Sequence, residues 1–234
     1  MPLFFSAFEV TRRTRRFGGT SFSNDVVAMA LDTLKGVSPT YYLDFLANRA
    51  IIAGSDVGKI STNVTFTSGT LNLSDAGHTI ASTANVLVLP VTISYPITVY
   101  CELVRSVDTG GIERYYQMDD GTEGNRAVLT VSAVDAFRPQ HFSASVNDMN
   151  IGTGVTAALS TIYKTATRYQ SGSGNGSFNG SIATDVATIA TATNPTTLRL
   201  GAGVLNVEPS TSIIRKIALI AGAQTNAQLQ ALTL

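Results

Sequence analysis

The centre of the chain is a close succession of short apolar segments separated by turn sequences, and this spacing constrains the fold most. We predict strands at 97–106, 113–121, 125–133 and 141–148. The sequences between them contain DTGG, DGTEGN and FRPQ, which carry the residues that favour tight turns. Only 14% of the 234 residues are charged, which also favours short strands over long surface helices. Together these features predict an all-β fold, an antiparallel sandwich or barrel.

Weaker strand patterns flank this region on both sides. Strand-like patterns also occur before it, at 41–52, 60–75 and 84–95, and Pro90 in the last of these indicates an edge strand or a bend. After it, strands are predicted at 160–170, 196–203 and 212–221. The Gly- and Ser-rich stretch SGSGNGSFNG at 171–180 has the composition of a mobile, exposed connection.

The first 36 residues differ from the rest. Residues 1–20 hold four arginines and Glu9, a balance of 4 − 1 = +3, whereas residues 21–234 hold 12 basic and 15 acidic groups, a balance of −3. We interpret this segment either as a solvated tail or as an arm that docks on a partner through its aromatic and basic residues, Phe4, Phe5, Phe8, Arg12, Arg13, Arg15 and Arg16. A helix is predicted at 24–35, packed across the β domain or used for docking.

Composition excludes several classes of protein. The single cysteine, Cys101, rules out an intrachain disulfide and fits folding in a reducing cytoplasm. Lys plus Arg equals Asp plus Glu at 16 each, so no nucleic-acid partner is expected. No apolar run has the length of a signal sequence or of a membrane span, so no membrane partner is expected either. A protein of this kind that acts outside a cell would leave by lysis or on a particle.

Motifs for catalysis are missing. His78 and His141 have no spacing partner that suggests zinc or a triad, and neither G-x-S-x-G nor H-E-x-x-H occurs. No strand carries the alternating carboxylates that glycoside hydrolysis would need. The turn with Asp119, Asp120 and Glu123 is either a solvated hairpin turn or a possible calcium ligand set, and no cofactor is predicted.

The same hairpin holds the residues best suited to a sugar. Tyrosine rings stack on sugars, and the adjacent Tyr115 and Tyr116 should point to opposite faces of a strand, one into the core and one outward. Arg114 and Arg126 either bind an acidic glycan or form surface ion pairs with nearby acids. The predicted carbohydrate-binding residues are Arg114, Tyr115, Tyr116, Asp119, Asp120 and Arg126.

The central stretch ITVYCELVRSVDTGGIERYYQMDDGTEGNRAVLTV and the ending AQTNAQLQAL resemble a known family. They are similar to the concanavalin A-like (laminin G/pentraxin-like) jelly-roll domains of tail, fibre and spike proteins of bacteriophages and gene-transfer particles. The resemblance covers about 41–234. It implies a two-sheet antiparallel sandwich, binding of cell-surface polysaccharide and residence on a virion.

From these observations we expect a docking segment, 1–36, followed by a concanavalin-like sandwich, 37–234. The expected function is that of a non-enzymatic virion fibre, spike or tail component that binds a host glycan, contacts other virion proteins through its arm and forms a homo-oligomer. A purely structural decoration or connector protein and a capsule depolymerase are the alternatives. The ending SIIRKIALIA is expected to be the closing strand, followed by a helix with a capping box at Thr225 and Gln228.

Overall fold

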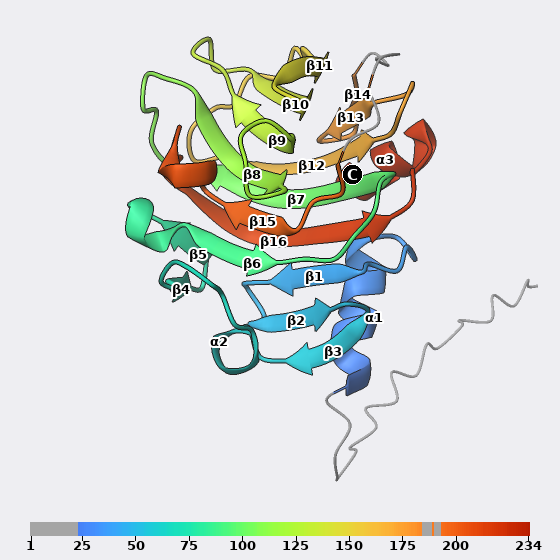
Figure 1. Ribbon diagram of the computed structural model, residues 1–234. Coiled ribbons are helices and arrows are strands. Elements are labelled where there is room, and N and C mark those ends of the chain that lie inside the picture. Colours follow the sequence, from blue (N-terminus) through green and yellow to red (C-terminus); the bar gives the residue numbers. More distant parts are fainter. Residues whose placement is uncertain (1–22, 184–188, 190–192) are drawn as a thin grey trace, which may run out of the picture.

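A computed structural model describes residues 23–183, 189 and 193–234, and these form two packed antiparallel sheets (Figure 1). The larger, ten-stranded sheet has the order β14-β13-β12-β7-β16-β1-β2-β3, with β5 also pairing with β16 and β4 pairing with β5. Its strands are β1 (Tyr41–Asp44), β2 (Arg49–Ile52), β3 (Ser55–Gly58), β4 (Leu73–Ser74), β5 (Gly77–Ile80), β7 (Ile97–Arg105), β12 (Ile162–Tyr169), β13 (Asn175–Phe178), β14 (Ser181–Ile182) and β16 (Ser212–Ala221).

The smaller sheet has six strands in the order β11-β10-β9-β8-β15-β6. They are β6 (Leu87–Pro90), β8 (Glu113–Asp119), β9 (Arg126–Val131), β10 (Phe137–Ser143), β11 (Val146–Asn150) and β15 (Thr197–Leu200). Three helices, α1 (Ser23–Thr33), α2 (Ile60–Asn63) and α3 (Asn226–Thr233), and two short 3-10 turns, η1 (Thr83–Asn85) and η2 (Val204–Asn206), complete the described elements. The predicted all-β, two-sheet jelly-roll sandwich is confirmed. None of the helices among these residues is long and apolar enough to cross a membrane.

The main core lies between the two sheets. In β7, Val99, Cys101 and Leu103 point inward, and they meet inward residues of β8 and β9 such as Met118 and Leu129. Alternation of buried and outward residues along each strand produces this layer, since successive side chains in a strand point to opposite faces.

A second apolar cluster covers the outside of the ten-stranded sheet. Ala218 and Ile220 of β16 and Tyr100 of β7 lie there, beneath side chains of α1 and of α3, including Leu229 and Leu232. The closing strand β16 is therefore apolar on both faces because one meets the core and the other meets the helices. The predicted capping box of α3 is confirmed, since the Thr225 side chain accepts from the Gln228 backbone and the Gln228 side chain accepts from the Thr225 backbone.

A β-bulge in β8 decides which residues of this strand face the core. Arg114 pairs with Thr130 of β9, but Tyr116 pairs with Leu129, so Tyr115 is an extra residue. A bulge shifts the alternation by one position, which places both Tyr115 and Tyr116 in the core cluster. The prediction that one of the two rings is exposed is therefore wrong: both have an exposed fraction of 0%.

Several predicted strands have different bounds. Residues 41–52 form two strands, β1 and β2, joined by a tight turn, whereas 60–75 contains α2 and only the two-residue β4. The segment 141–148 contains a hairpin turn, because Ala144 and Ser145 both have positive φ between β10 and β11. The edge position predicted for the strand with Pro90 is confirmed, since β6 ends the six-stranded sheet.

Two segments predicted as connections are strands. The FRPQ sequence, predicted as a turn, begins β10, where Pro139 pairs with Leu129 of β9. The Pro139 carbonyl oxygen accepts a hydrogen bond from Ile151 N, just past the end of β11, so the backbone nitrogen of Pro139 also faces the β11 side. Pairing of β10 with β11 begins only at Gln140, so proline at this position removes no hydrogen bond between paired strand residues.

Part of the Gly- and Ser-rich segment 171–180 is the buried strand β13, not a mobile connection. Its small side chains let α3 approach closely: the Ser177 hydroxyl lies 2.8 Å from the Thr233 hydroxyl, and a Cβ on Gly180 would lie 2.6 Å from Leu234. The β13 part of this segment therefore lies in the ten-stranded sheet, under a helix.

Candidate functional site

The outer face of the six-stranded sheet is lined mainly by polar residues, and we call it the polar face. The inward residues of β8, β9, β10 and β15 fill the core, so the residues between them point outward. The polar face consists of Arg114, Gln117 and Asp119 from β8, Arg126, Val128 and Thr130 from β9, Arg138, Gln140 and Phe142 from β10, and Thr197 and Arg199 from β15.

The pairing register aligns these residues in rows across the strands. Arg138, Thr130 and Arg114 are direct neighbours in one row. Gln140, Val128, Gln117 and Arg199 form the next row, and Phe142, Arg126, Asp119 and Thr197 form the third. Neighbours in such a row have their Cβ atoms about 4.5–5.5 Å apart. The middle of the face is buried, with Gln117 at 0%, Val128 at 1% and Thr130 at 3% exposed, so a ligand would contact mainly the partly exposed side chains, such as those of β10.

Arg114 is fully engaged within the protein. Its Nε donates to Glu208 Oε2 at 2.6 Å and its Nη1 to Glu123 Oε2 at 2.6 Å, and Nη1 also contacts Gln117 Oε1. Glu208 belongs to the segment 201–211, which crosses back to the other sheet after β15. Arg114 thus holds this segment against the polar face and is only 5% exposed.

Glu123 is the acidic centre of this contact. Burial would raise the pKa of its carboxyl, but the hydrogen bond and charge of Arg114, with further bonds from Gln117 and Val204 N, lower it below its ordinary value. Glu123 is thus an anion at neutral pH that is already bound by its neighbours.

Asp119 and Asp120 are also occupied. Asp119 accepts from Arg199 Nε at 2.8 Å and from Gln117 Nε2 at 3.0 Å. Asp120, in the turn, accepts from Asn125 at 2.8 Å and from the Thr122 hydroxyl at 2.6 Å. Burial raises the pKa of Asp120, but these hydrogen bonds outweigh it and lower the pKa overall. The geometry places the acids in a hydrogen-bonded hairpin turn, and no group of three or more His, Cys, Asp or Glu within the described ranges is placed to hold a metal ion.

Arg126 and Phe142 form a stacked pair at one margin of the polar face. The guanidinium carbon of Arg126 lies 3.4 Å from the centre of the Phe142 ring, a close cation–π contact. The Arg126 side chain is 13% exposed, and its Nε lies 3.5 Å from Glu123. The pair presents a flat surface with a positive charge and a partly exposed aromatic ring.

Arg138 differs from the other three arginines of the polar face. Its Nε is buried and makes no hydrogen bond, and no contact to its other guanidinium nitrogens is formed by the residues that the structure describes. Within the described part of the chain, Gln140, two positions along, receives only a long 3.5 Å hydrogen bond from Thr130 on its carbonyl oxygen. A buried donor without an acceptor is costly, and an anion or hydroxyl from a ligand would satisfy it.

The structure places some of the predicted sugar-binding residues on the polar face and others in the core. Arg114, Asp119 and Arg126 lie together on the polar face, and Asp120 lies in the adjoining turn. The expectation of sugar stacking by Tyr115 or Tyr116 does not fit their complete burial, which the bulge in β8 causes. The predicted docking residues Phe4, Phe5, Phe8, Arg12, Arg13, Arg15 and Arg16 lie outside the described residues.

Sequence reasoning missed Arg138, Gln140 and Phe142. The proline in FRPQ indicates a turn from sequence alone, so the alternating positions of these three residues along β10 are not recognised as a strand. The alternation of polar residues with Phe137, Pro139 and His141 is the signal that could have revealed them.

The two histidines have buried partners. His78 Nε2 lies 2.9 Å from Asn85 O. Burial lowers the pKa of this imidazole and outweighs its backbone hydrogen bonds, which would raise it. His141 Nδ1 lies 2.6 Å from Asp148 Oδ1, and its ring packs edge-on against Tyr95. Both imidazoles are 0% exposed and lie in the fold interior rather than on the polar face.

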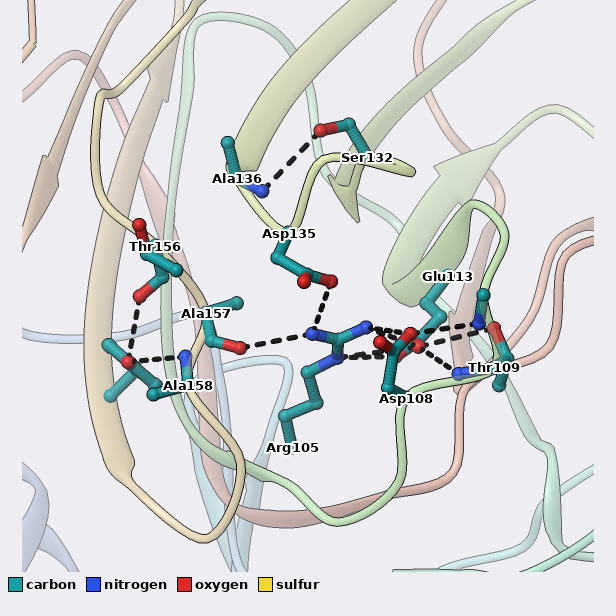
Figure 2. A network of polar contacts seen from close by, with 12 residues as sticks. Arg105, Asp108, Thr109, Glu113, Ser132, Asp135, Ala136, Thr156, Ala157 and Ala158 are labelled. Carbon is teal, nitrogen blue, oxygen red and sulfur yellow. Dashed lines mark hydrogen bonds and ion pairs between the residues drawn. The ribbon is translucent and has the colours of Figure 1, made fainter.

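A second polar network surrounds Arg105, at one end of the sandwich (Figure 2). Its guanidinium bonds to Glu113 of β8 at 2.9 Å, to Asp108 and Asp135 at 2.7 Å each, and to the carbonyl oxygen of Ala157 at 3.1 Å. These partners lie on segments that join the sheets or neighbouring strands: 106–112, 132–136 and 151–161. Arg105 and Glu113 are almost completely buried, so this network is part of the framework.

Comparison with known proteins gives structural matches only. No protein family and no curated protein matches the sequence. Trypanosoma rangeli sialidase in complex with sialic acid matches with a TM-score of 0.57 and 12% identity, over 82% of this chain and 32% of that one. The chain therefore corresponds to about a third of the length of that enzyme.

Smaller domains match as well. The Ruminococcus gnavus IT-sialidase CBM40 bound to alpha2,6 sialyllactose has a TM-score of 0.51 and 11% identity, over 60% of this chain and 85% of that one. The same domain bound to alpha2,3 sialyllactose has a TM-score of 0.50 and 13% identity. At these identities the matches establish the shared jelly-roll sandwich.

Proposed function

We propose that this chain is a non-enzymatic glycan-binding module whose ligand lies on the polar face. The observation that carries the proposal is Arg138, a partly buried arginine without a partner among the described residues, beside the underused amide of Gln140. A guanidinium with free donors fits a carboxylate through two parallel hydrogen bonds. The proposed ligand is therefore a glycan that carries a carboxylate, such as a sialylated or uronic-acid-containing chain.

The neighbouring residues support this assignment. Phe142, held against Arg126, offers an aromatic surface to the apolar side of a sugar ring. Arg199 lies in the same rows, has a partly exposed side chain and can donate further hydrogen bonds to hydroxyl groups, whereas Gln117 and Asp119 are buried and bonded within the protein. Two of the structural matches are domains bound to sialyllactose, which carries one carboxylate, and this agrees with the proposed ligand class.

The test compares acidic and neutral glycans on the full-length protein. We expect sialyllactose or a uronic-acid oligosaccharide to bind, and lactose to bind at least about tenfold more weakly, because it cannot pair with Arg138. Arg138→Gln should remove this preference. Arg215→Gln is the matched control, since Arg215 is a partly exposed arginine on the outer face of the other sheet.

Calorimetry or ligand-observed NMR measures the binding. Equal binding of acidic and neutral glycans by the native protein would contradict the proposed ligand class. An unchanged affinity in Arg138→Gln, with binding lost in a Phe142→Ala variant, would place a glycan on the polar face but reject the role of Arg138.

We also propose that the module is carried on a virion or gene-transfer particle, attached by residues 1–36, and binds host polysaccharide there as a homo-oligomer. The resemblance of the central hairpin and the ending to phage tail and fibre domains supports this. Detection of the protein in purified particles by mass spectrometry, and its loss from particles when residues 1–22 are removed, tests it. The cut falls before α1 because Val26, Ala30 and Leu34 of this region belong to the outer apolar cluster.

A structural role on the particle is the second candidate. The observation that favours it is a set of exposed apolar side chains at the Arg105 end of the sandwich, including Val134 at 73% exposed. Absence of glycan binding together with incorporation into particles would favour this role. A depolymerase would instead release new reducing ends from capsule polysaccharide, and none is expected because the carboxylates around the polar face are bound to arginines or turn residues.

A further inference from the structure

We infer that the Arg105 end of the sandwich is a protein-binding surface and that its occupant is the N-terminal arm, residues 1–22, of a second copy of this chain. The inference rests on the proposed docking role of the arm and is independent of glycan binding. It specifies which surface the arm meets and thereby how copies join.

Exposed apolar residues gather on the segments that Arg105 holds together. Val107 and Ile112 lie on 106–112, Val134 on 132–136, and Leu159 on 151–161, with exposed fractions of 49%, 46%, 73% and 47%. We call these four residues the crossover surface. Each is within two residues of a partner of Arg105, namely Asp108, Glu113, Asp135 or Ala157. Arg105 binds Asp108, Asp135 and Ala157 (Figure 2), so one guanidinium holds together the three segments that carry these four residues.

The apolar surface continues onto the outside of the ten-stranded sheet. Ile162 pairs with Val104, and Val104 pairs with Ile213, so three apolar side chains form one row across β12, β7 and β16. Ile162 is 46% exposed, and none of the three belongs to the cluster under α1 and α3. Contiguous exposed apolar residues of this kind mark interaction sites.

The chemistry of the crossover surface fits a peptide better than a sugar. The segments 106–112, 132–136 and 151–161 contain no aromatic residue, and their exposed large side chains are aliphatic. Sugar sites use aromatic stacking and dense hydrogen bonding, which this surface lacks.

Charge favours a basic partner. Arg105 contributes one positive charge and Asp108, Glu113 and Asp135 contribute three negative charges, a balance of 1 − 3 = −2, and the three segments hold no other charged residue. Asp108 and Asp135 bind Arg105 through Oδ1 only, and their side chains are 44% and 41% exposed. Each therefore has a second carboxylate oxygen available to a basic group.

The arm supplies the matching groups. It combines Phe4, Phe5 and Phe8 with the four arginines at 12, 13, 15 and 16, and residues 1–20 have a balance of +3. Aromatic side chains and arginines are the residues that contribute most at protein interfaces. A segment of 22 residues can reach at most roughly 70–80 Å, which is enough to pass from one copy to the next.

The arm and the crossover surface are different parts of the chain. The arm precedes α1, which lies on the outside of the ten-stranded sheet, whereas the crossover surface lies where the chain passes between the sheets. Copies therefore join either by reciprocal exchange of arms in a two-fold dimer or head-to-tail in a ring or an open row.

The test uses the full chain and follows its mass by analytical ultracentrifugation over a dilution series. We expect reversible association that is weakened at least about tenfold by Val134→Asp, by Leu159→Asp and by reversal of the arm charges in Arg12→Glu/Arg13→Glu. Val146→Ser is the matched control, since Val146 is 65% exposed but is the first residue of β11, near the other end of β10. Because Val134 and Val146 are both exposed, neither change should lower the melting temperature, and thermal unfolding verifies this.

Cross-linking of a mixture of isotopically light and heavy copies identifies the occupant. Links between the arm of one copy and residues 106–112, 132–136 or 151–161 of another support the inference. A monomer at every concentration, links only within one copy, or association that survives both Val134→Asp and the arm charge reversal would each overturn it. Glycan binding measured on the same variants separates this outcome from failure of the proposed glycan site.

Discussion

Replacing Arg105 by methionine tests whether the buried network at the sandwich end holds the fold together. The substitution preserves most of the apolar stem and removes the charge. Glu113 has an exposed fraction of 0%, so it would be left as a buried carboxylate whose partner is gone. Breaking a buried pair in this way costs about 3–5 kcal/mol of unfolding free energy.

The two other carboxylates should add little. Asp108 and Asp135 are 44% and 41% exposed, and solvent-screened pairs of this kind contribute about 0–1 kcal/mol each. We therefore expect Arg105→Met to lose about 4 kcal/mol, which corresponds to a melting temperature lower by about 8–16 °C for a chain of this size. Asp108→Asn and Asp135→Asn should each lose about 1 kcal/mol or less.

Chemical denaturation at pH 7 measures these differences. The double variant Arg105→Met/Glu113→Gln should recover part of the loss, because no unpaired buried charge remains. The reasoning would be refuted if Asp135→Asn were as destabilising as Arg105→Met, or if the double variant were less stable than Arg105→Met.

Three further predictions concern other parts of the fold. Glu123→Gln should weaken the dependence of the unfolding free energy on pH in the acid range. The pKa of Glu123 is lowered in the folded state, so its ionised carboxylate stabilises the fold above the ordinary value of 4.5 and this contribution is lost as the pH falls. Urea unfolding from pH 7 to pH 3 measures the difference. Thr225→Ala should cost about 1 kcal/mol by removing the cap of α3, and an unchanged melting temperature would mean that the capping box is dispensable. Gly69→Ala should lower the unfolding free energy by more than about 2 kcal/mol, because a Cβ there would lie 2.0 Å from the Val86 carbonyl oxygen and φ is +90°. Gly121→Ala, at φ +95° but in open space, should lower it by only about 1 kcal/mol. Equal losses for the two variants would contradict the steric argument.

The fold class could be predicted from sequence because its signals are local. Turn sequences such as DTGG and DGTEGN, the apolar run at 212–221 and the Thr225–Gln228 cap each act within a few residues, and all three describe the structure correctly. The strands at FRPQ and at 171–180 were not predicted because they depend on tertiary context. Pro139 is tolerated because β11 does not pair with β10 at this position, and α3 covers the glycines and serines of 171–180.

The candidate site could be predicted only in part. The sequence groups Arg114, Asp119 and Arg126 because they share one hairpin, and the structure places all three on the polar face. Arg138 belongs to another hairpin, and its importance comes from having no partner among the described residues, a property that no sequence pattern expresses. The assignment of Tyr115 and Tyr116 failed because strand alternation was taken as unbroken.

The bulge at Tyr115 has a consequence for anyone who would redesign the specificity of this module. Along β8 the outward positions are 114, 117 and 119, so a mutant library that follows simple alternation from Arg114 would vary Tyr116 and Met118 and destroy the core. Deleting Tyr115 would restore even spacing and leave Glu113 and Gln117 on their present sides of the sheet, but it would remove from the core the Tyr115 ring and its hydrogen bond to Glu113. Selection for new ligands should keep the extra residue and vary the positions on β9, β10 and β15, where the alternation is regular.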